Sequence, residues 1–263
     1  MKIKAVVKVM NFHSLLHINA ARKTAEKYFR LENEINKLID LIVNNRNFIL
    51  DKHILKVNPR NPVLNIYIGS DFGFCGSVNS KVNEKLLADD RAQKIVIGKK
   101  LRFKQSKPVL FMTRDGFEAD STPVEEFLER AIQDLTYSEI NIIYNHYYDL
   151  SRISMVKKKV FPLSLVQNVD ELYTEDFTVE GNVDDLLKSL ISSYVTYEVK
   201  IAFVYSFASE NIARQNATTE SLKKIDERME ELELKERKEK KQKSFRKVVE
   251  SFVKTQGFGG KKL

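Results

Sequence analysis

Glycine and proline are missing from both ends of this chain. Neither residue type occurs in residues 1–58 or in residues 182–256, and all five prolines lie between those stretches. Because glycine and proline cost about 1 and 3 kcal/mol at an interior helix site, their absence predicts two long, uninterrupted helices. The second would run about 110 Å at about 1.5 Å per residue, far beyond the usual helix of about 11–12 residues. Such lengths indicate a shaft, a lever or a coiled-coil spacer.

Apolar residues recur at intervals of three and four along both stretches, the pattern of helices that pack along one side. The predicted seam of the first helix comprises Ala21, Ala25, Tyr28, Leu31, Ile35, Leu38, Leu41 and Ile42. The predicted seam of the second comprises Leu186, Leu190, Tyr194, Tyr197 and Ile201, and further along Leu222, Ile225, Met229 and Leu232. The β-branched residues of segment 3–10 allow a strand, but continuity with the first stretch favours helix. We therefore expect a long antiparallel two-helix coiled coil formed by both termini.

The middle of the chain alternates strand-like and helix-like segments. The predicted strands are 63–69, 94–97, 109–113, 139–144 and 159–163, and the predicted helices are 78–88 and 124–135. Thr122 is the expected N-cap of the last helix, because Pro123 follows it and Glu125 lies three residues on. Such alternation is typical of a mostly parallel sheet with helices on its faces. The expected fold class is α/β, with a central Rossmann-like domain beside the coiled coil.

Four parts of the chain are expected from these patterns. They are an N-terminal coiled-coil helix at 1–58, a Rossmann-like domain at 59–164, an acidic connector at 165–181, and a C-terminal coiled-coil helix with a flexible tail at 182–263. No run of about 18 apolar residues occurs, so we do not expect the chain itself to span a membrane. Its single cysteine, Cys75, excludes an internal disulfide.

The net charge of +8 indicates an acidic or polyanionic partner. About half of the excess comes from residues 223–247, which include Lys235, Arg237, Lys238, Lys240, Lys241 and Lys243. Three interpretations of this basic stretch are open: a solvated helix face, a contact with acidic protein loops, or a nucleic-acid contact. Glu236 and Glu239 interrupt the stretch and make nucleic acid the least favoured. An apolar seam resumes after it at Phe245, Val249 and Phe252.

Few residues in the sequence suggest catalysis. The glycine-rich turn at 70–79 stands between a strand and a helix, where backbone amides can bind phosphate. It lacks the Gly-Lys-Ser/Thr ending of a P-loop and the G-x-G-x-x-G pattern, which favours a structural turn. Cys75 has Asp71 nearby rather than a cation, and a buried structural thiol is favoured. His13 and His17 have metal-compatible spacing but lack the glutamate of H-E-x-x-H. We expect no catalytic, cofactor or metal site.

Three short motifs occur in order along the chain. Residues 20–23 read AARK, the turn carries Ser70, Asp71, Gly73, Cys75, Gly76 and Asn79, and the second helix carries Ser209, Glu210, Ala213, Arg214 and Ala217. They resemble the Ala-Ala-x-Lys, Ser-Asp-x-Gly-x-Cys-Gly-x-x-Asn and Ser-Glu-x-x-Ala-Arg-x-x-Ala patterns of the gamma subunit of rotary F-type ATPases. His13, Ser14 and His17 stand where that family usually has a Thr-Lys pair and a further lysine, which indicates a divergent gamma-like subunit.

The resemblance implies a central-stalk rotor that is not itself an enzyme. ATP hydrolysis would occur in a hexameric ring of alpha-like and beta-like nucleotide-binding subunits, and this chain would transmit the rotation, or the reverse for ATP synthesis. The implied partners are that ring and base or membrane-side rotor subunits, or a divergent structural partner, with no direct nucleic acid. The implied place is cytoplasmic, peripheral at the inner face of the cell membrane through partners. An alternative is an ATPase-linked motility or cytoskeletal adaptor that uses the same fold, and a less favoured one is a coiled-coil nucleic-acid-binding protein.

The resemblance also directs attention to the residues that would meet the ring or position the shaft. The expected partner contacts are the six basic residues, the three apolar residues Phe245, Val249 and Phe252 beyond them, and Glu210 with Arg214. Glu210 and Arg214 are expected to form an i, i+4 pair that reaches the middle domain. An exposed pair of that kind contributes only about 0.3–0.5 kcal/mol, so a positioning role is expected of it.

Overall fold

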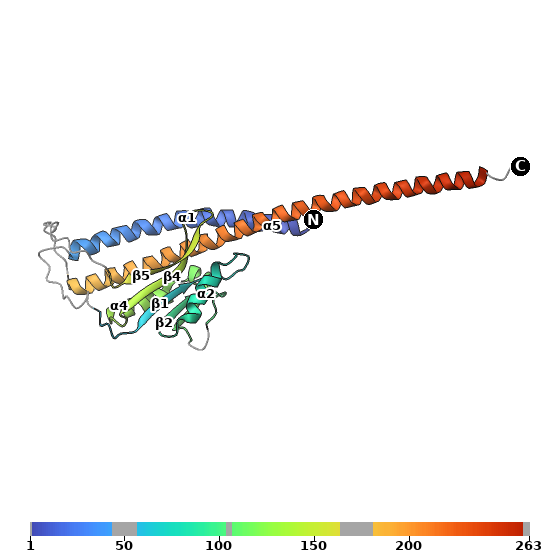
Figure 1. Ribbon diagram of the computed structural model, residues 1–263. Coiled ribbons are helices and arrows are strands. Elements are labelled where there is room, and N and C mark those ends of the chain that lie inside the picture. Colours follow the sequence, from blue (N-terminus) through green and yellow to red (C-terminus); the bar gives the residue numbers. More distant parts are fainter. Residues whose placement is uncertain (1, 44–56, 104–106, 164–180, 260–263) are drawn as a thin grey trace. The chain divides into compact units, whose positions relative to one another are not determined.

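The two terminal helices are continuous in the computed structural model, which describes residues 2–43, 57–103, 107–163 and 181–259 (Figure 1). Helix α1 spans Lys2–Val43 and helix α5 spans Val183–Gly259. The helical alternative for segment 3–10 is therefore confirmed. The tail was expected to leave the helix at Gly257, which is wrong: α5 runs on to Gly259, and glycine is the residue type that most favours a helix C-terminus. The predicted acidic connector lies outside the described residues, apart from Gly181.

Two compact units make up the chain. One consists of residues 10–217, and the other joins residues 1–9 to residues 218–263. The larger unit holds the sheet, the short helices and the adjoining parts of α1 and α5. The smaller unit holds the first turns of α1 and the remainder of α5, where Lys4 and Asp226 form an ion pair.

A five-stranded sheet organises the larger unit. The strands are β1 (Val63–Ile68), β2 (Gln93–Ile97), β3 (Leu110–Met112), β4 (Glu139–Tyr147) and β5 (Ile153–Phe161), in the spatial order β3-β2-β1-β4-β5. The first four are parallel, and β5 runs antiparallel to β4. The mostly parallel α/β sheet is confirmed. Strand β5 begins six residues before the predicted position, because its lysines at 157–159 hide the strand pattern.

Three short helices join the strands. They are α2 (Val78–Ala88), α3 (Arg114–Ala119) and α4 (Thr122–Gln133). Helix α3 is too short, and its glycine too unfavourable, for the sequence to have predicted it. The predicted cap of α4 is wrong by one residue: Thr122 is the first helical residue, and Ser121 is the N-cap. The hydroxyl of Ser121 bonds to the carboxylate of Glu125, which also pairs with Lys200 at 2.8 Å.

Within residues 10–217, α5 packs against both α1 and the sheet (Figure 1). On the α1 side, the Asn11 side chain donates to the carbonyl of Gln215 at 3.1 Å, and the rings of Tyr28 and Tyr197 lie 6.2 Å apart. Later α1 residues thus meet earlier α5 residues, and the antiparallel arrangement is confirmed. On the sheet side, the Ser209 hydroxyl donates to the carbonyl of Asn145 in β4 at 3.0 Å.

The seam of α1 differs from the predicted one. Leu31 and Leu38 are exposed, and Ile39 is buried in their place. The buried positions of α1 are Ser14, Ile18, Ala21, Ala25, Glu32, Ile39 and Ile42, with Tyr28 and Ile35 half-buried between them. These positions alternate at intervals of four and three, as in a heptad repeat. The sequence-based prediction placed the leucines at 31 and 38 in the seam, because they are more apolar than Glu32, and it therefore omitted Glu32 and Ile39.

The predicted seam of α5 also needs correction. Leu186 is exposed, and the buried stripe of this segment contains Leu187, Ile191, Val195, Val199 and Ala202. In the smaller unit Met229 and Leu232, predicted seam residues, are exposed. The burial pattern of residues 187–212 differs from the predicted one because this part of α5 packs against two partners, α1 and the sheet. Burial on two sides spreads apolar residues over more of the helix than a single coiled-coil seam would.

Candidate functional site

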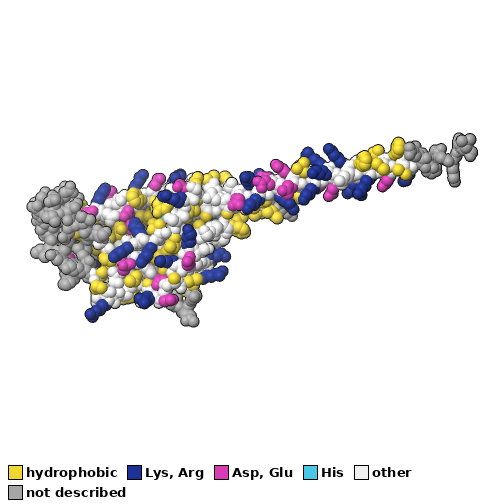
Figure 2. Space-filling view, in the orientation of Figure 1, with side chains coloured by type: hydrophobic (Ala, Val, Ile, Leu, Met, Phe, Trp, Pro, Cys, Tyr) yellow, Lys and Arg dark blue, Asp and Glu magenta, His cyan; other side chains and the backbone are white. Residues whose placement is uncertain are grey.

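The basic stretch of α5 is fully open to solvent. All six of its cationic residues are exposed, and in Figure 2 dark blue side chains follow this part of α5. Within the described part of the chain, only Arg237 of the six forms an ion pair, with Glu233 at 3.9 Å. The other five cations form no ion pair with the described residues, and they can meet charges on another molecule.

An exposed apolar segment follows the basic stretch. Phe245 is 70% exposed and Phe252 is 62% exposed, and Val248 and Val249 are exposed between them. Yellow side chains in Figure 2 mark this segment near the C-terminal end of α5. Contiguous apolar side chains left in water indicate an interaction surface. The described structure thus leaves the predicted contact residues of the helix end available.

Glu210 and Arg214 are not exposed, unlike the other predicted contacts. The two form an i, i+4 ion pair whose side chains are 3% and 12% exposed. Arg214 Nε donates to the carbonyl of Gly73 at 3.4 Å, and its Nη1 donates to Asn211 Oδ1 at 2.8 Å. The predicted i, i+4 pair is thus present, and through Arg214 it joins α5 to the glycine-rich turn of the middle domain. Burial raises the pKa of Glu210, although the Arg214 charge opposes that shift.

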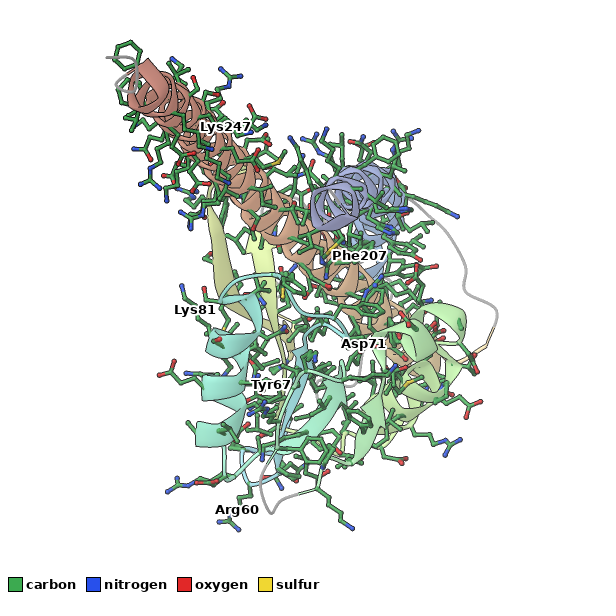
Figure 3. All side chains as sticks on the ribbon, turned by 90° about the vertical axis from the view of Figure 1, so that its right-hand side faces the viewer. Arg60, Tyr67, Asp71, Lys81, Phe207 and Lys247 are labelled. Carbon is green, nitrogen blue, oxygen red and sulfur yellow. The ribbon has the colours of Figure 1, made fainter. Side chains whose placement is uncertain are left out.

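The glycine-rich turn uses its polar atoms within the protein. The carboxylate of Asp71, buried in Figure 3, accepts the backbone N–H of Lys99 at 2.7 Å and of Arg114 at 3.1 Å. Asn79 accepts the backbone N–H of Ser70 at 3.1 Å and donates to its hydroxyl at 2.7 Å. The Asp71 side chain therefore binds amides that follow β2 and begin α3, and it ties the turn to those two elements. The favoured interpretation, a structural turn, agrees with these contacts.

Cys75 lies buried inside this turn. Burial raises the pKa of its thiol, and the nearby Glu210 charge adds to the effect. A thiol with a raised pKa is a poor nucleophile at neutral pH. Asn79 donates to the sulfur at 3.4 Å, so the side chain is held in place as part of the turn. The arrangement is that of a structural cysteine, which the sequence favoured.

His13 and His17 do not form part of a larger ligand cluster. Their rings lie 6.4 Å apart, and His17 packs edge-on against Phe207 at 5.2 Å. Among the described residues there is no group of three or more potential metal ligands. Burial lowers the pKa of His17, and the charge of Arg114 lowers it further.

Arg114 is the residue that the sequence did not single out. It is buried, and its guanidinium lies 3.5 Å from the centre of the Phe207 ring. Its Nη2 also pairs with Glu118 at 2.8 Å. Arg114 thus connects α3, the Asp71 loop and α5, through contacts made by its backbone and its side chain. An arginine in a polar segment carries no sequence sign of burial, so no pattern could have found it.

The chain matches a family model along most of its length. The model described as ATP synthase covers residues 1–244. The chain belongs to the ATP synthase family. The ATP synthase gamma chain of Clostridium perfringens (strain SM101 / Type A) is 25% identical over 252 residues, with 89% of this chain and 86% of that protein covered. The ATP synthase gamma chain of Wolbachia pipientis subsp. Culex pipiens (strain wPip) is 25% identical over 259 residues, with 89% of each covered.

Solved structures share the fold of this member of the ATP synthase family. One chain from the central stalk and c-ring structure of the Tetrahymena thermophila mitochondrial ATP synthase superposes with a TM-score of 0.56 at 18% identity, and the match covers 82% of this chain and 99% of that one. The expected gamma-subunit family and the α/β fold are confirmed. No helix in the described residues is both long and apolar enough to cross a bilayer.

Proposed function

We propose that this chain transmits rotation as a non-catalytic shaft, and that α5 carries the surface that meets the ring of nucleotide-binding subunits. The observation that supports this is the exposed cationic band of α5, whose five lysines form no ion pair with the described residues, followed by an exposed apolar end. A rotor must present its faces to successive ring subunits without adhering to any of them. Exposed charges suit this, because each exposed ion pair contributes little and re-forms readily.

The apolar end from Phe245 to Phe252 has a separate task in this proposal. Its side chains would sit in a collar of the ring and hold the tip of the helix on the rotation axis. The buried Glu210–Arg214 pair would instead hold α5 against the glycine-rich turn, so that torque on α5 is passed to the sheet. The four parts expected along the chain then correspond to two shaft helices, a connector and a sheet domain that meets the base of the rotor.

The isolated chain is expected neither to bind ATP tightly nor to hydrolyse it. The glycine-rich turn lacks the Gly-Lys-Ser/Thr ending of a P-loop, its Asp71 and Asn79 side chains are engaged within the protein, and the thiol of Cys75 is buried with a raised pKa. Equilibrium dialysis with labelled ATP, together with a phosphate-release assay on the purified chain, would measure both properties. Saturable binding of one ATP per chain would contradict the proposal.

Reversing four lysines of the band to glutamate, at positions 235, 238, 240 and 241, is expected to weaken assembly with the ring and to lower ATPase activity of the assembled complex. The loss is expected to grow as ionic strength falls, since screening between charges weakens and the Debye length rises from about 8 Å at 0.15 M to about 30 Å at 0.01 M. The measurement is ATPase activity and ring recovery of the reconstituted complex at both salt concentrations.

A matched control reverses four exposed lysines of the sheet domain, at positions 81, 85, 100 and 107. Lys81, for example, lies on the outer side of α2 (Figure 3). The control changes net charge equally but leaves α5 intact, so ring assembly and its salt dependence should stay at the wild-type level. Equal losses in both variants, or no loss in the first at low salt, would show that the band is only a solvated helix face.

Co-purification from cells separates the rotor role from the alternative. Nucleotide-binding ring subunits together with small rotor or membrane subunits would support the rotor, held at the inner face of the cell membrane through those partners. A ring recovered with other structural proteins in place of those subunits would support a motility or cytoskeletal adaptor. Salt-sensitive recovery of nucleic acid would contradict both.

A further inference from the structure

One position in the buried seam of α1 carries an acid. Glu32 is the sole ionisable side chain among the buried positions of the described part of α1, and it is 8% exposed. Glu198 of α5 is 1% exposed, and its charge acts on Glu32. Both residues belong to the larger compact unit. Two carboxyl groups have thus been brought together at the contact between the terminal helices, where heptad positions are usually apolar.

The two carboxyl groups lie close enough for the charge of Glu198 to act on Glu32, and among the described residues each has one nitrogen donor of its own. An ionised carboxylate has no hydrogen to donate, so two neighbouring carboxyl groups can bond to each other only if one of them carries a proton. Lys158 Nζ lies 2.5 Å from Glu198 Oε1 and neutralises that carboxylate. Glu32 accepts only a neutral donor, Asn36 Nδ2 at 2.8 Å. The proton therefore belongs on Glu32.

The surroundings favour the protonated form of Glu32. Burial raises the pKa of Glu32, and the neighbouring charge of Glu198 raises it further. The Asn36 hydrogen bond and the more distant Lys158 charge act in the opposite direction. The other titratable groups that act on the pair are Tyr194 of α5, Tyr144 of β4 and Lys158 of β5, and His146 of β4 in turn lies near Lys158.

If Glu32 ionises, the two carboxylates carry two negative charges and Lys158 balances only one of them. The tyrosines remain neutral, since burial and the Glu198 charge raise the pKa of Tyr144 to about 12. Burial lowers the pKa of His146, as does the charge of Lys158, so His146 adds no positive charge near neutral pH. One cation therefore serves two carboxyl groups. A cavity of roughly 550 Å³ is lined in part by two neighbours of the pair, Asn36, which donates to Glu32, and Tyr194.

We propose that Glu32 and Glu198 hold one shared proton between α1 and α5, and that this proton makes the helix contact sensitive to pH. While the proton is present, Glu32 donates to Glu198 and the seam is closed by a hydrogen bond. When the proton is lost, two buried carboxylates repel each other across the same contact. The contact between α1 and α5 then weakens without any change in the apolar seam on either side.

The direction of the pH effect follows from the raised pKa of Glu32. Its value in the unfolded chain is about 4.5. The folded chain binds the proton more tightly, so the stabilising contribution is complete below that value and is lost as pH rises through the folded pKa. Stability from this pair therefore declines from mildly acidic toward alkaline pH, which is opposite to the behaviour of an ordinary carboxylate in a salt bridge.

Glu32→Gln tests the proposal, because glutamine resembles the protonated glutamate. Its Oε1 can accept from Asn36 and its Nε2 can donate to Glu198, with no proton to lose. We expect the Tm of the full-length variant to exceed that of the wild type by an amount that grows by about 3–5 °C from pH 5 to pH 8. Infrared difference spectra, wild type minus variant at pH 7, should show the carbonyl band of one protonated carboxylic acid.

Glu26→Gln is the matched control, since Glu26 is an exposed glutamate on the same helix. It should follow the wild-type Tm at every pH and should produce no carboxylic acid band in the difference spectrum. Circular dichroism of both variants checks that the helices are retained. A Tm difference for Glu32→Gln that is flat between pH 5 and pH 8, or a difference spectrum without the band, would overturn the shared proton.

Discussion

Replacing Ile39 with aspartate is expected to destabilise the chain by about 4 kcal/mol or more. Ile39 is 1% exposed and belongs to the main apolar core. Removing a buried isoleucine costs about 2–5 kcal/mol, and a carboxyl group without a hydrogen-bond partner in its place adds to that cost. This is a large share of the 5–15 kcal/mol that typically separates folded from unfolded states. Urea unfolding followed by circular dichroism would measure the loss.

Leu38→Asp is the decisive comparison for this first prediction. Leu38 is the adjacent residue, it was predicted from the sequence to face the seam, and it is 48% exposed. An exposed substitution usually changes the free energy of unfolding by no more than about 0.5 kcal/mol. The two variants introduce the same charge one residue apart. If Leu38→Asp proved the more destabilising, the seam would follow the register predicted from the sequence rather than the one in the structure.

Replacing Arg214 with alanine is expected to cost about 3–5 kcal/mol at neutral pH. The change leaves the Glu210 carboxylate buried without its cation, and removing one member of a buried ion pair has a cost of this size. It also removes the hydrogen bonds to Gly73 and Asn211. Thermal and urea unfolding of the variant would measure the effect. Arg228→Ala is the control, because Arg228 and Glu231 form an exposed pair on the same helix, which should contribute about 0.3–0.5 kcal/mol.

The pH dependence identifies the cause of the Arg214 effect. Burial already raises the pKa of Glu210, and Arg214 is the largest opposing influence. Without Arg214 the folded pKa rises further, so the variant loses more stability than the wild type as pH increases. The stability deficit of the variant should therefore be smaller at pH 5 than at pH 8. At pH 5 Glu210 is closer to its protonated form, so the deficit there comes mainly from lost packing and lost hydrogen bonds. A deficit that does not change with pH would assign the effect to packing alone.

The order and type of the secondary-structure elements could be predicted because those properties are local. The absence of glycine and proline from both ends was enough to predict α1 and α5, since each interior glycine or proline adds its own cost to a helix. Alternating apolar segments were enough for the five strands. The same reasoning missed α3, whose six residues are held by Thr113 and by the buried Asp71 rather than by helix propensity.

The candidate site was predicted in part for a similar reason. The exposed cations and the apolar end of α5 are visible in the sequence as composition, and the described structure leaves them in water. The Glu210–Arg214 pair is visible as an i, i+4 spacing, but its burial is not. Arg114 was not visible at all, because its contacts with Phe207 and Asp71 come from parts of the chain that are about 40 to 90 positions away.

By itself the sequence determined that two long helices flank a mostly parallel α/β sheet, and that the glycine-rich turn is not a P-loop. Only the tertiary structure decided which face of each helix is buried. Two pairs of positions in α1 satisfy the spacing of a seam: 31 with 38, and 32 with 39. Hydrophobicity alone favours the first pair, because both of its residues are leucine and the second pair includes Glu32. The second pair is buried because the fold places Glu32 near Glu198 of α5 and places Ile39 in the apolar core that also holds Ile191 of α5 and Val160 of β5. The free energy of burial depends on the surface that a residue meets, which no local pattern contains.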